Sequence, residues 1–400
     1  MHNYSISRTV APFLIIAVPI AAMIAWILYH KQPAAPKPQA APAAQAVSFG
    51  GESWAIFRGD PELTGRAVGD LPDKLKPAWT FQTGGEIAAA PVVADGTVYA
   101  ASMDEHLYAL DLADGTEKWR FKADDTLQAA PLYFNGTVYV GSSGGTLWAV
   151  DVQTGQPKWS FSEAGEITGS ANIADGPAGQ TLVVFGSYDN NLYCLDAADG
   201  TLVFEHPADN YINGAVAVAD NTAFFGSCDA KVYQIPLNDP AAAKTLDTGS
   251  YVASNPAIDG GVMYVGNYEG RFLAADIATQ EILWSYQHEF RDPFFSSPAV
   301  NDEVVVVGCR DKKLYCFDKA SGKIRWTFTG GHVFDSSPVI CGAHLAVGNN
   351  DGRLYLINLK TGKETFSYTL GSSVTGSPAI AGNRLLIGAD NGTLYAFTAR

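Results

Sequence analysis

Two histidines in the C-terminal half lie close to acidic residues, an arrangement that general acid–base chemistry uses. His288 is followed by Asp292, and His332 by Asp335. A histidine beside a carboxylate can take up and release a proton near neutral pH. Both pairs fall in irregular loop segments, where a single histidine is more often a surface residue than a catalytic one. We therefore predict no catalytic residue in this chain.

Cysteine chemistry is the second candidate, because a thiolate can act as a nucleophile or bind a metal ion. The five cysteines are Cys194, Cys228, Cys309, Cys316 and Cys341. Five is an odd number, so at least one thiol is unpaired. No cysteine and histidine spacing matches a zinc site, and no EF-hand-like calcium loop is present. We predict no metal site, and we expect Cys194 and Cys316 to be packed core thiols.

An internal repeat positions all these residues, and its clearest copy is Ala130–Phe161. The four expected strands of this copy are Leu132–Phe134, Thr137–Gly141, Thr146–Asp151 and Pro157–Phe161. Asn135-Gly136 between the first two suits a type I′ turn, in which both central residues need φ > 0. Asp151 can close an Asx-turn while Gly155 takes a left-handed conformation. The unit predicts one four-stranded antiparallel sheet.

Two markers count the copies of this unit. The residue that opens the first strand recurs as Pro91, Pro131, Ala171, Val216, Pro256, Pro298, Pro338 and Pro378. The position twenty residues later recurs as Asp111, Asp151, Asp196, Pro236, Asp276, Asp318, Asn358 and Thr398. Both markers advance in the same steps of 40 to 45 residues. The chain therefore contains eight units.

Sheets of this size cannot bury both hydrophobic faces alone, so they must pack against neighbours. Repeats of 40 to 50 residues with four strands are typical of a β-propeller. Outer strands carry aromatic residues at one position, namely Trp79, Trp119, Trp159, Phe204, Trp284, Trp326 and Phe366. Unit four has Lys244 there, so its outer strand should be the weakest. We predict an all-β, eight-bladed propeller, most simply a monomer.

Closure of the ring can also be predicted. The last unit, 378–400, supplies three strands, whereas the strand around Trp79 precedes every complete unit. Pairing the two removes the last open edge. We expect the strand around Trp79 to complete the final blade.

The mouth of the predicted channel is the candidate binding surface. Segments that join each outer strand to the next innermost strand gather there and differ between units. Aromatic residues and arginine favour protein interfaces. The candidate partner-binding residues are Tyr211, Tyr251, Arg291, Phe294, Phe295, His332, Phe334 and Asp335. The alternative is a solvated loop whose aromatic side chains fold onto neighbouring blades.

The N-terminal region predicts a membrane anchor. Residues 1–10 form a short polar tail, and Ala11–Tyr29 is an uncharged run of nineteen residues, long enough as a helix to span a bilayer. A cleaved signal peptide ending near Ala46 is the alternative. We expect a transmembrane anchor at 11–30, a Pro/Ala-rich linker at 31–50, and the propeller at 51–400. The chain would then be a single-pass inner-membrane protein with its propeller in the periplasm or extracytoplasmic space.

Charge excludes one class of partner. The formal net charge is −15 and the sequence pI is about 4.8. Nucleic acids need a basic surface, so we predict no nucleic-acid binding. An acidic surface with a local aromatic and arginine patch suits peptides or proteins instead.

The chain resembles a known superfamily in its leader and its repeat. The leader runs Trp54-Ala-Ile-Phe57-Arg58-Gly59-Asp60 and continues to Thr64-Gly65, and the repeat reads Leu-Tyr-Ala followed by an Asp, a Gly and a Trp. These motifs and the eight units are similar to the pyrroloquinoline-quinone (PQQ) propeller superfamily over residues 54–400. One branch contains quinoprotein dehydrogenases, and the other contains BamB-like scaffolds of outer-membrane protein assembly. The motifs consist of turn and packing residues, so they indicate the fold more than the function.

What the enzyme branch implies can be compared with this chain. Its members hold PQQ between a tryptophan and a pair of adjacent bonded cysteines, with Ca²⁺ bound by Glu, Asn and Asp. No two cysteines are adjacent here, and six tryptophans occupy repeat positions, namely Trp79, Trp119, Trp148, Trp159, Trp284 and Trp326. We therefore expect a non-enzymatic, BamB-like scaffold without a cofactor, whose partners are proteins or peptides of the cell envelope. The alternative is a PQQ-binding oxidoreductase.

Overall fold

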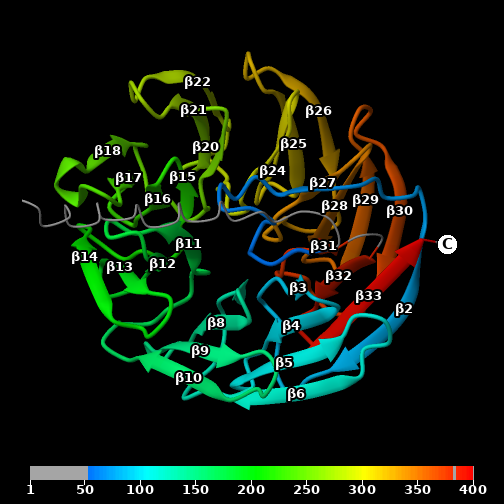
Figure 1. Cartoon of the computed structure of the whole chain (residues 1–400). Coiled ribbons are helices and arrows are strands. Elements are labelled where there is room, and N and C mark those ends of the chain that lie inside the picture. Colours follow the sequence, from blue (N-terminus) through cyan, green and yellow to red (C-terminus); the bar gives the residue numbers. More distant parts are fainter. Residues whose placement is uncertain (1–52, 382–383, 400) are drawn as a thin grey trace, which may run out of the picture. The chain divides into compact units, whose positions relative to one another are not determined.

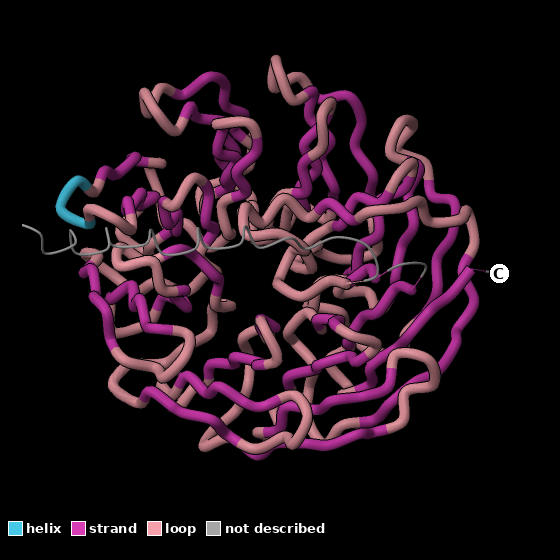
Figure 2. The backbone as a smooth tube through the Cα atoms, viewed as in Figure 1, coloured by secondary structure: helices cyan, strands magenta, loops and turns pink. Residues whose placement is uncertain are grey.

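The computed structural model describes residues 53–381 and 384–399, and these residues form a ring of eight sheets (Figure 1). Each sheet is four-stranded, and all pairing within it is antiparallel; one sheet gains a short fifth strand. Strands and turns make up almost all of the described chain, with a single 3₁₀ turn, η1, at Pro240–Ala242 (Figure 2). The prediction of an all-β, eight-bladed propeller is confirmed.

Four strands build each blade, in order from the innermost to the outermost. Blades one to four are β3 (Val92–Ala94), β4 (Thr97–Ala101), β5 (His106–Asp111), β6 (Glu117–Lys122); β7 (Leu132–Phe134), β8 (Thr137–Gly141), β9 (Leu147–Asp151), β10 (Pro157–Phe161); β11 (Asn172–Asp175), β12 (Thr181–Gly186), β13 (Asn191–Asp196), β14 (Leu202–Pro207); β15 (Ala217–Ala219), β16 (Thr222–Gly226), β17 (Lys231–Pro236), β18 (Lys244–Asp247). Blades five to eight are β19 (Ala257–Asp259), β20 (Val262–Gly266), β21 (Arg271–Asp276), β22 (Ile282–Gln287); β23 (Ala299–Val300), β24 (Val304–Gly308), β25 (Lys313–Asp318), β26 (Ile324–Thr329); β27 (Val339–Cys341), β28 (His344–Asn349), β29 (Arg353–Asn358), β30 (Glu364–Thr369); β31 (Ala379–Ala381), β32 (Arg384–Gly388), β33 (Thr393–Ala399), β2 (Leu75–Gln82).

Turn residues shape each blade as the sequence predicts. Asn135 and Gly136 have φ values of 45° and 74°, the positive pair that a type I′ turn requires. Asp151 accepts the amide hydrogens of Gln153 and Thr154, and Gly155 has φ 66°. The turn sequence thus fixes where each strand begins and ends.

Tryptophans of the outer strands join consecutive blades. Their indole Nε1 atoms donate to carbonyl oxygens of the next blade at 2.8–3.2 Å, in the pairs Trp79–Leu112, Trp119–Val152, Trp159–Ala197, Trp284–Lys319 and Trp326–Leu359. Each ring lies on a glycine; at Gly155, a Cβ would come within 2.8 Å of the Trp119 ring. These tryptophans are structural, as the repeat predicts.

The ring is closed by the first long strand of the chain. β2 pairs with β33 in antiparallel register, with Trp79 opposite Ala396, and the two lie side by side at the right of Figure 1. This confirms the predicted closure. Because β33 would otherwise be an edge strand, β2 leaves the last blade with the same four strands as the others.

The junction between blades four and five departs from this pattern. β18 is the shortest outer strand among the described residues, with four residues. Lys244 takes the place of the tryptophan and reaches Ala278 O at 3.4 Å. On blade five, Gln280 with φ 61° takes the place of the glycine. The predicted weakness of this outer strand thus has a visible counterpart in its length and contacts.

The predicted tail, anchor and linker at residues 1–50 lie outside the described residues. Within residues 53–381 and 384–399, the structure contains no helix of the length and hydrophobicity that crossing a membrane requires.

Candidate functional site

The two ends of the channel differ, and each needs a name. The closed end is the one at which the hairpins of the innermost strands turn, such as Asp95-Gly96 between β3 and β4. The open mouth is the opposite end, where the loops that precede the innermost strands gather. Figure 1 looks along the channel.

The leader, Trp54–Ala67, crosses the closed end and contacts the innermost region of seven blades in order. Its hydrogen bonds to blades one to seven are Trp54 with Val93, Ala55 O with Tyr133 N, Pro61 O with Asn172 Nδ2 and Val218 N, Glu62 O with Ile258 N, Thr64 O with Val300 N, and Gly65 O with Ile340 N. It ends as β1 (Arg66–Ala67), which pairs in parallel with β27. The leader is therefore bound mainly through backbone hydrogen bonds, and its blue trace passes across the channel in Figure 1.

Arg58 explains part of the leader motif. Its side chain is 1% exposed, and Nη2 donates to Pro298 O at 2.8 Å. Burial lowers the pKa of Arg58 to about 9, so the guanidinium is still charged at neutral pH. A Cβ at Gly65 would lie 1.9 Å from Nη2, and therefore only glycine fits there.

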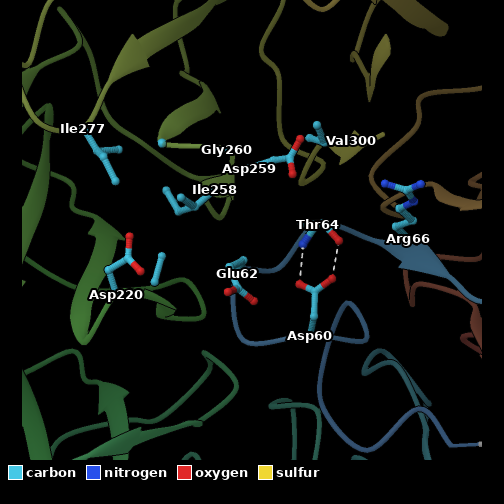
Figure 3. A pocket seen from close by; sticks show the side chains of 12 residues that line it. Asp60, Glu62, Thr64, Arg66, Asp220, Ile258, Asp259, Gly260, Ile277 and Val300 are labelled. Atoms are coloured by element: carbon cyan, nitrogen blue, oxygen red, sulfur yellow. Dashed lines mark hydrogen bonds between the residues drawn. The ribbon is translucent and has the colours of Figure 1, made fainter. Parts of the chain in front are cut away.

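An acidic pocket of about 420 Å³ opens beside the leader at the closed end (Figure 3). Its carboxylates are Asp60, Glu62, Asp220 and Asp259. Asp60 accepts hydrogen bonds from the amide and the hydroxyl of Thr64, and burial raises the pKa of both Asp60 and Glu62. The leader carboxylates are thus held within the structure, and the pocket has an acidic lining.

The channel between the two ends is narrow, with a cavity of about 190 Å³. Side chains in its wall bond from blade to blade: the pairs are Ala130 N to Ser170 Oγ, Ala215 N to Asn255 Oδ1, Asn255 N to Ser297 Oγ, Ser297 N to Ser337 Oγ, and Ser337 N to Ser377 Oγ. Phe57 of the leader lines the same cavity. The wall is therefore built of small polar residues that mainly hold blades together.

A ring of equivalent turn residues frames the open mouth. Their amides donate at 2.8–3.2 Å to loop carbonyls, in the pairs Met103–Glu86, Ser143–Thr126, Tyr188–Glu166, Cys228–Tyr211, Tyr268–Tyr251, Arg310–Pro293, Asn350–Val333 and Asp390–Ser373. The backbone contact is the same in all eight blades, whereas the side chains differ. The mouth is thus a constant frame that carries variable side chains.

Aromatic residues gather over blades three to six of this frame. Tyr188 stacks on Tyr211 with centroids 5.3 Å apart, Tyr251 meets Tyr268 at 6.4 Å, and Tyr268 meets Phe295 at 5.6 Å. Tyr211 and Tyr251 are 50% and 56% exposed. We call these five residues the aromatic arc. It includes three of the residues that the sequence singled out.

Two ion pairs lie beside the aromatic arc. The guanidinium carbon of Arg310 lies 3.8 Å from the centroid of the Phe295 ring. The same guanidinium forms a bidentate ion pair with the Asp335 carboxylate, with N–O distances of 2.8 and 3.2 Å. Arg291 is largely exposed and pairs with Glu269 at 3.0 Å. The structure therefore brings Phe295 and Asp335 together through Arg310, and it places Arg291 at the rim.

Phe294 and Phe334 need a correction, because both side chains are fully buried and cannot meet a partner. They occupy a core position four residues before each blade opening, or before its equivalent, held in turn by Ile87, Leu127, Ile167, Ile212, Val252, Phe294, Phe334 and Val374. A Cβ at Gly266 would lie 2.4 Å from the Cβ of Phe294, so the second strand packs closely against this residue. For these two residues, the alternative of inward folding is correct.

The two histidines are in different surroundings. His288 is 5% exposed; its Nδ1 accepts the amide hydrogen of Asp292, and its Nε2 lies 3.2 Å from Asp311. His332 is exposed, and Asp335 is held by Arg310 instead. Among the described residues, no hydrogen bond or ion pair joins His332 to Asp335. That the chain has no catalytic residue stays a prediction.

His288, Cys309 and Asp311 form a cluster that sequence spacing could not reveal, with ligand atoms within 4.8 Å of one another. Asp311 Oδ2 also accepts from Lys313 Nζ at 2.8 Å and from Tyr315 OH at 2.6 Å. Burial raises the pKa of the Cys309 thiol, which disfavours the thiolate that binds metals. These contacts fit a buried hydrogen-bond network better than a metal site.

In the described residues all five cysteines are free, and Cys194 and Cys316 are core thiols as predicted.

The channel wall can be tested against PQQ, the cofactor of the enzyme branch. PQQ carries three carboxylates, so its site needs cationic donors. No lysine or arginine lines the described cavity, and Asp335 is its one charged lining residue. A volume of about 190 Å³ is also below the roughly 300–1,000 Å³ of typical small-molecule sites. These residues do not fit PQQ.

Sequence reasoning missed Tyr188, Tyr268 and Arg310 at the mouth. Phe290, which is 78% exposed beside Arg291, lies in a predicted mouth loop but was not among the candidate residues. Tyr188, Tyr268 and Arg310 each lie two residues after the end of the second strand of their blade. Comparing this position across the eight units would have found them. The leader's path carries no repeat, and no sequence signal predicted it.

Comparison with known proteins agrees with this geometry. A family model described as outer membrane protein assembly factor BamB matches residues 64–187 and 238–400, well over half of the chain. The BamB of Nitrosomonas eutropha is 29% identical over 121 residues, which are 30% of this chain and 26% of that protein. The chain spans about a quarter or less of the length of the curated relatives it matches.

Two solved structures share the fold. BamB from Moraxella catarrhalis superposes with a TM-score of 0.69 at 17% identity, covering 81% of this chain and 100% of that one. Quinohemoprotein alcohol dehydrogenase from Comamonas testosteroni superposes with a TM-score of 0.72 at 14% identity, covering 87% and 80%. At such identities the likeness concerns the fold alone. The repeats, the closed ring and the family match together place this chain in the PQQ-like propeller family described as outer membrane protein assembly factor BamB.

Proposed function

We propose that this chain is a non-enzymatic scaffold of the cell envelope that binds proteins or peptides at its open mouth. In this proposal the N-terminal segment anchors it in the inner membrane as a single-pass protein, with the propeller on the extracytoplasmic side. Assembly of outer-membrane proteins, as in the name of the family, is the process we assign to it. No cofactor takes part.

The observation that carries the proposal is the aromatic arc on a repeated backbone frame. Exposed tyrosines on a rigid frame lose little side-chain entropy on binding, and tyrosine and arginine are enriched at interface hot spots. Tyr211, Tyr251 and Arg291 are all at least half exposed. The frame itself is held by backbone hydrogen bonds, so these side chains are not needed to maintain it.

An alanine scan tests the proposal. The full chain, carrying Tyr211→Ala, Tyr251→Ala or Arg291→Ala, would be purified from solubilised membranes together with its bound proteins. We expect each variant to lose the same specific partner by severalfold, measured by quantitative mass spectrometry. The matched control is Leu283→Ala, since Leu283 is 53% exposed but lies on the outer strand β22. Full retention by all three mouth variants would refute the assignment.

A PQQ-binding oxidoreductase is the second candidate, because the fold is shared with quinohemoprotein alcohol dehydrogenase over 87% of this chain. Absorbance titration of the full chain with PQQ and Ca²⁺, followed by dye reduction with alcohols and sugars, separates the two. We expect no saturable binding, since the channel cavity has no lining cation among the described residues. Tight binding with turnover would favour the enzyme.

A further inference from the structure

Blade five lacks a contact that five other blades make at the open mouth. In blades one, three, four, six and seven, a third-strand tyrosine hydroxyl donates to an aspartate four residues earlier at 2.6–2.7 Å, in the pairs Tyr108–Asp104, Tyr193–Asp189, Tyr233–Asp229, Tyr315–Asp311 and Tyr355–Asp351. Blade five has Leu273 and Glu269 at these positions. The tyrosine–aspartate bond is therefore missing there.

The same tyrosine also fills space next to the preceding loop. The hydroxyl of Tyr233 accepts the amide hydrogen of Asp209, and Tyr193 OH lies 3.4 Å from Glu163 O. The residue of blade five that corresponds to Asp209 is Gly249, which has no side chain. With neither the tyrosine ring nor a loop side chain, this region is open.

A groove of about 620 Å³ occupies this region, within the range of typical ligand sites. We call it the blade-five groove, and it is lined by Ala230, Thr248, Gly249, Ser250, Tyr251, Asn267, Glu269, Arg271, Gln287 and Arg291. Its wall is preformed, because buried Asn267 donates to Thr248 O at 2.9 Å and accepts from the amides of Glu269 and Arg271. Thr248 Oγ1 in turn donates to Ala230 O at 2.9 Å.

Arg271 is the free cation of the groove. Among the described residues, its guanidinium makes one long contact, from Nη1 to Thr248 O at 3.5 Å, and no ion pair. The cations at the equivalent position in blades four and six are both paired, Lys231 with Asp209 and Lys313 with Asp311. Blade five has Gly249 in place of Asp209, and Glu269 in place of Asp311. Because Glu269 pairs with Arg291, Arg271 has neither partner.

We propose that the blade-five groove binds a protein segment in which a carboxylate lies next to an aromatic residue. Arg271 would take the carboxylate through its planar pair of N–H donors, which match two oxygens. Tyr251, at 56% exposed, and Tyr268, at 45%, offer the aromatic contact beside it. One free guanidinium suits a single carboxylate rather than a polyanion. The acidic pocket at the closed end has the opposite lining, so it would repel the same segment.

The carboxylate can come from an aspartate or glutamate side chain or from a C-terminus. That the occupant is a protein segment rests on the proposed function. The probe is a fluorescein-labelled octapeptide of glycine and serine with a central Phe-Asp pair and an amidated end. A second peptide ends in phenylalanine with a free carboxylate. Peptides with Phe-Asn and Phe-Lys are the references. Fluorescence anisotropy with the full chain in detergent gives each affinity.

We expect at least one carboxylate peptide to bind, and Arg271→Gln to weaken it about tenfold or more, since a charge-assisted pair is lost. Tyr251→Ala should weaken it several-fold. The matched control is Arg353→Gln, because Arg353 holds the equivalent position in blade seven, where Tyr355 and Asp351 are still bonded. That variant should bind as the unaltered chain does.

Three outcomes would overturn the inference: no carboxylate peptide binding at about 1 mM, the weak end of the affinity scale; equal binding of the Phe-Asn peptide; or full binding by Arg271→Gln. A further result is that the peptide binds in an Arg271-dependent way while no partner is lost in the alanine scan. That result would support the blade-five groove as a binding site and refute the proposed function. Partner loss without peptide binding would do the reverse.

Discussion

The closed end and the open mouth of the channel are built on the same ring but from different kinds of contact. At the closed end, one segment of chain crosses the channel, binds seven blades through hydrogen bonds and buries Ile56, Arg58 and Leu63. At the open mouth, eight equivalent turns hold the backbone, and the side chains of Tyr211 and Tyr251 remain half exposed. The leader side chains therefore support the structure at the closed end, whereas Tyr211 and Tyr251 are free to bind at the open mouth.

The largest effect on stability would come from breaking the ring, because both ends of the channel are built on it. Deleting residues 75–82 removes β2 and leaves β33 as an unpaired edge. We expect the melting temperature to fall by more than about 10 °C, given that 1 kcal/mol corresponds to roughly 2–4 °C in large domains. Calorimetry checks this, with the exposed Lys76→Ala in the same strand as control. An unchanged melt would rule out closure by β2.

A pair of truncations compares the two ends directly. Ile56→Ala at the closed end leaves a cavity in the core and should lower the free energy of unfolding by about 2–5 kcal/mol. Tyr251→Ala at the open mouth removes an exposed ring and should change it by less than about 0.5 kcal/mol. Urea unfolding followed by fluorescence measures both. Equal losses would mean that the mouth side chains also support the structure.

Two glycines of the ring measure how much tryptophan docking contributes to stability. Gly155 and Gly136 both have positive φ, but a Cβ at Gly155 would lie 2.8 Å from the Trp119 ring, whereas a Cβ at Gly136 has nothing within 4 Å. Gly136→Ala should cost about 1 kcal/mol through backbone strain, and Gly155→Ala about 1–3 kcal/mol more through displacement of the ring. Their difference in urea unfolding measures tryptophan docking. No difference would contradict it.

Acid should weaken the turns of the ring by a small amount. Hydrogen bonds from Arg325 and Ser321 hold the pKa of Asp318 at about 2, below its unfolded value near 4. Because the folded pKa is depressed, this stabilisation is present above about pH 4 and is lost as the pH falls toward 2. Asn358 keeps the same turn in blade seven with a neutral amide. We expect Asp318→Asn to flatten the fall of the melting temperature between pH 5 and pH 2.5; parallel curves would contradict this.

Much of the ring could be predicted from sequence, because its determinants repeat. Asn135-Gly136 and Asp151 form turns within one unit, and Trp119 contacts the next unit. Because the pattern recurs in eight units, it can be distinguished from chance. Closure followed from the same register, since Trp79 is an outer-strand residue without a preceding blade. Local turn chemistry and a constant period are enough to define such a fold.

The candidate site was harder to predict, because it is made where units differ. Phe294 and Phe334 looked like loop aromatics, yet their position is apolar in every unit, and the core takes them. Tyr188 and Tyr268 reach the mouth from turns between second and third strands, whereas the sequence placed the mouth only in the segments before the innermost strands. The leader's route across seven blades depends on backbone carbonyls, which carry no residue-type signal.

Site-specific photo-crosslinking in native membranes tests the difference between the two ends most directly. A photoreactive residue would replace Tyr251 at the open mouth or Asp220, an exposed residue of the acidic pocket, at the closed end. We predict a specific protein adduct from position 251 and none from position 220. Adducts from position 220 alone, or the same adducts from both positions, would contradict the assignment of binding to the open mouth.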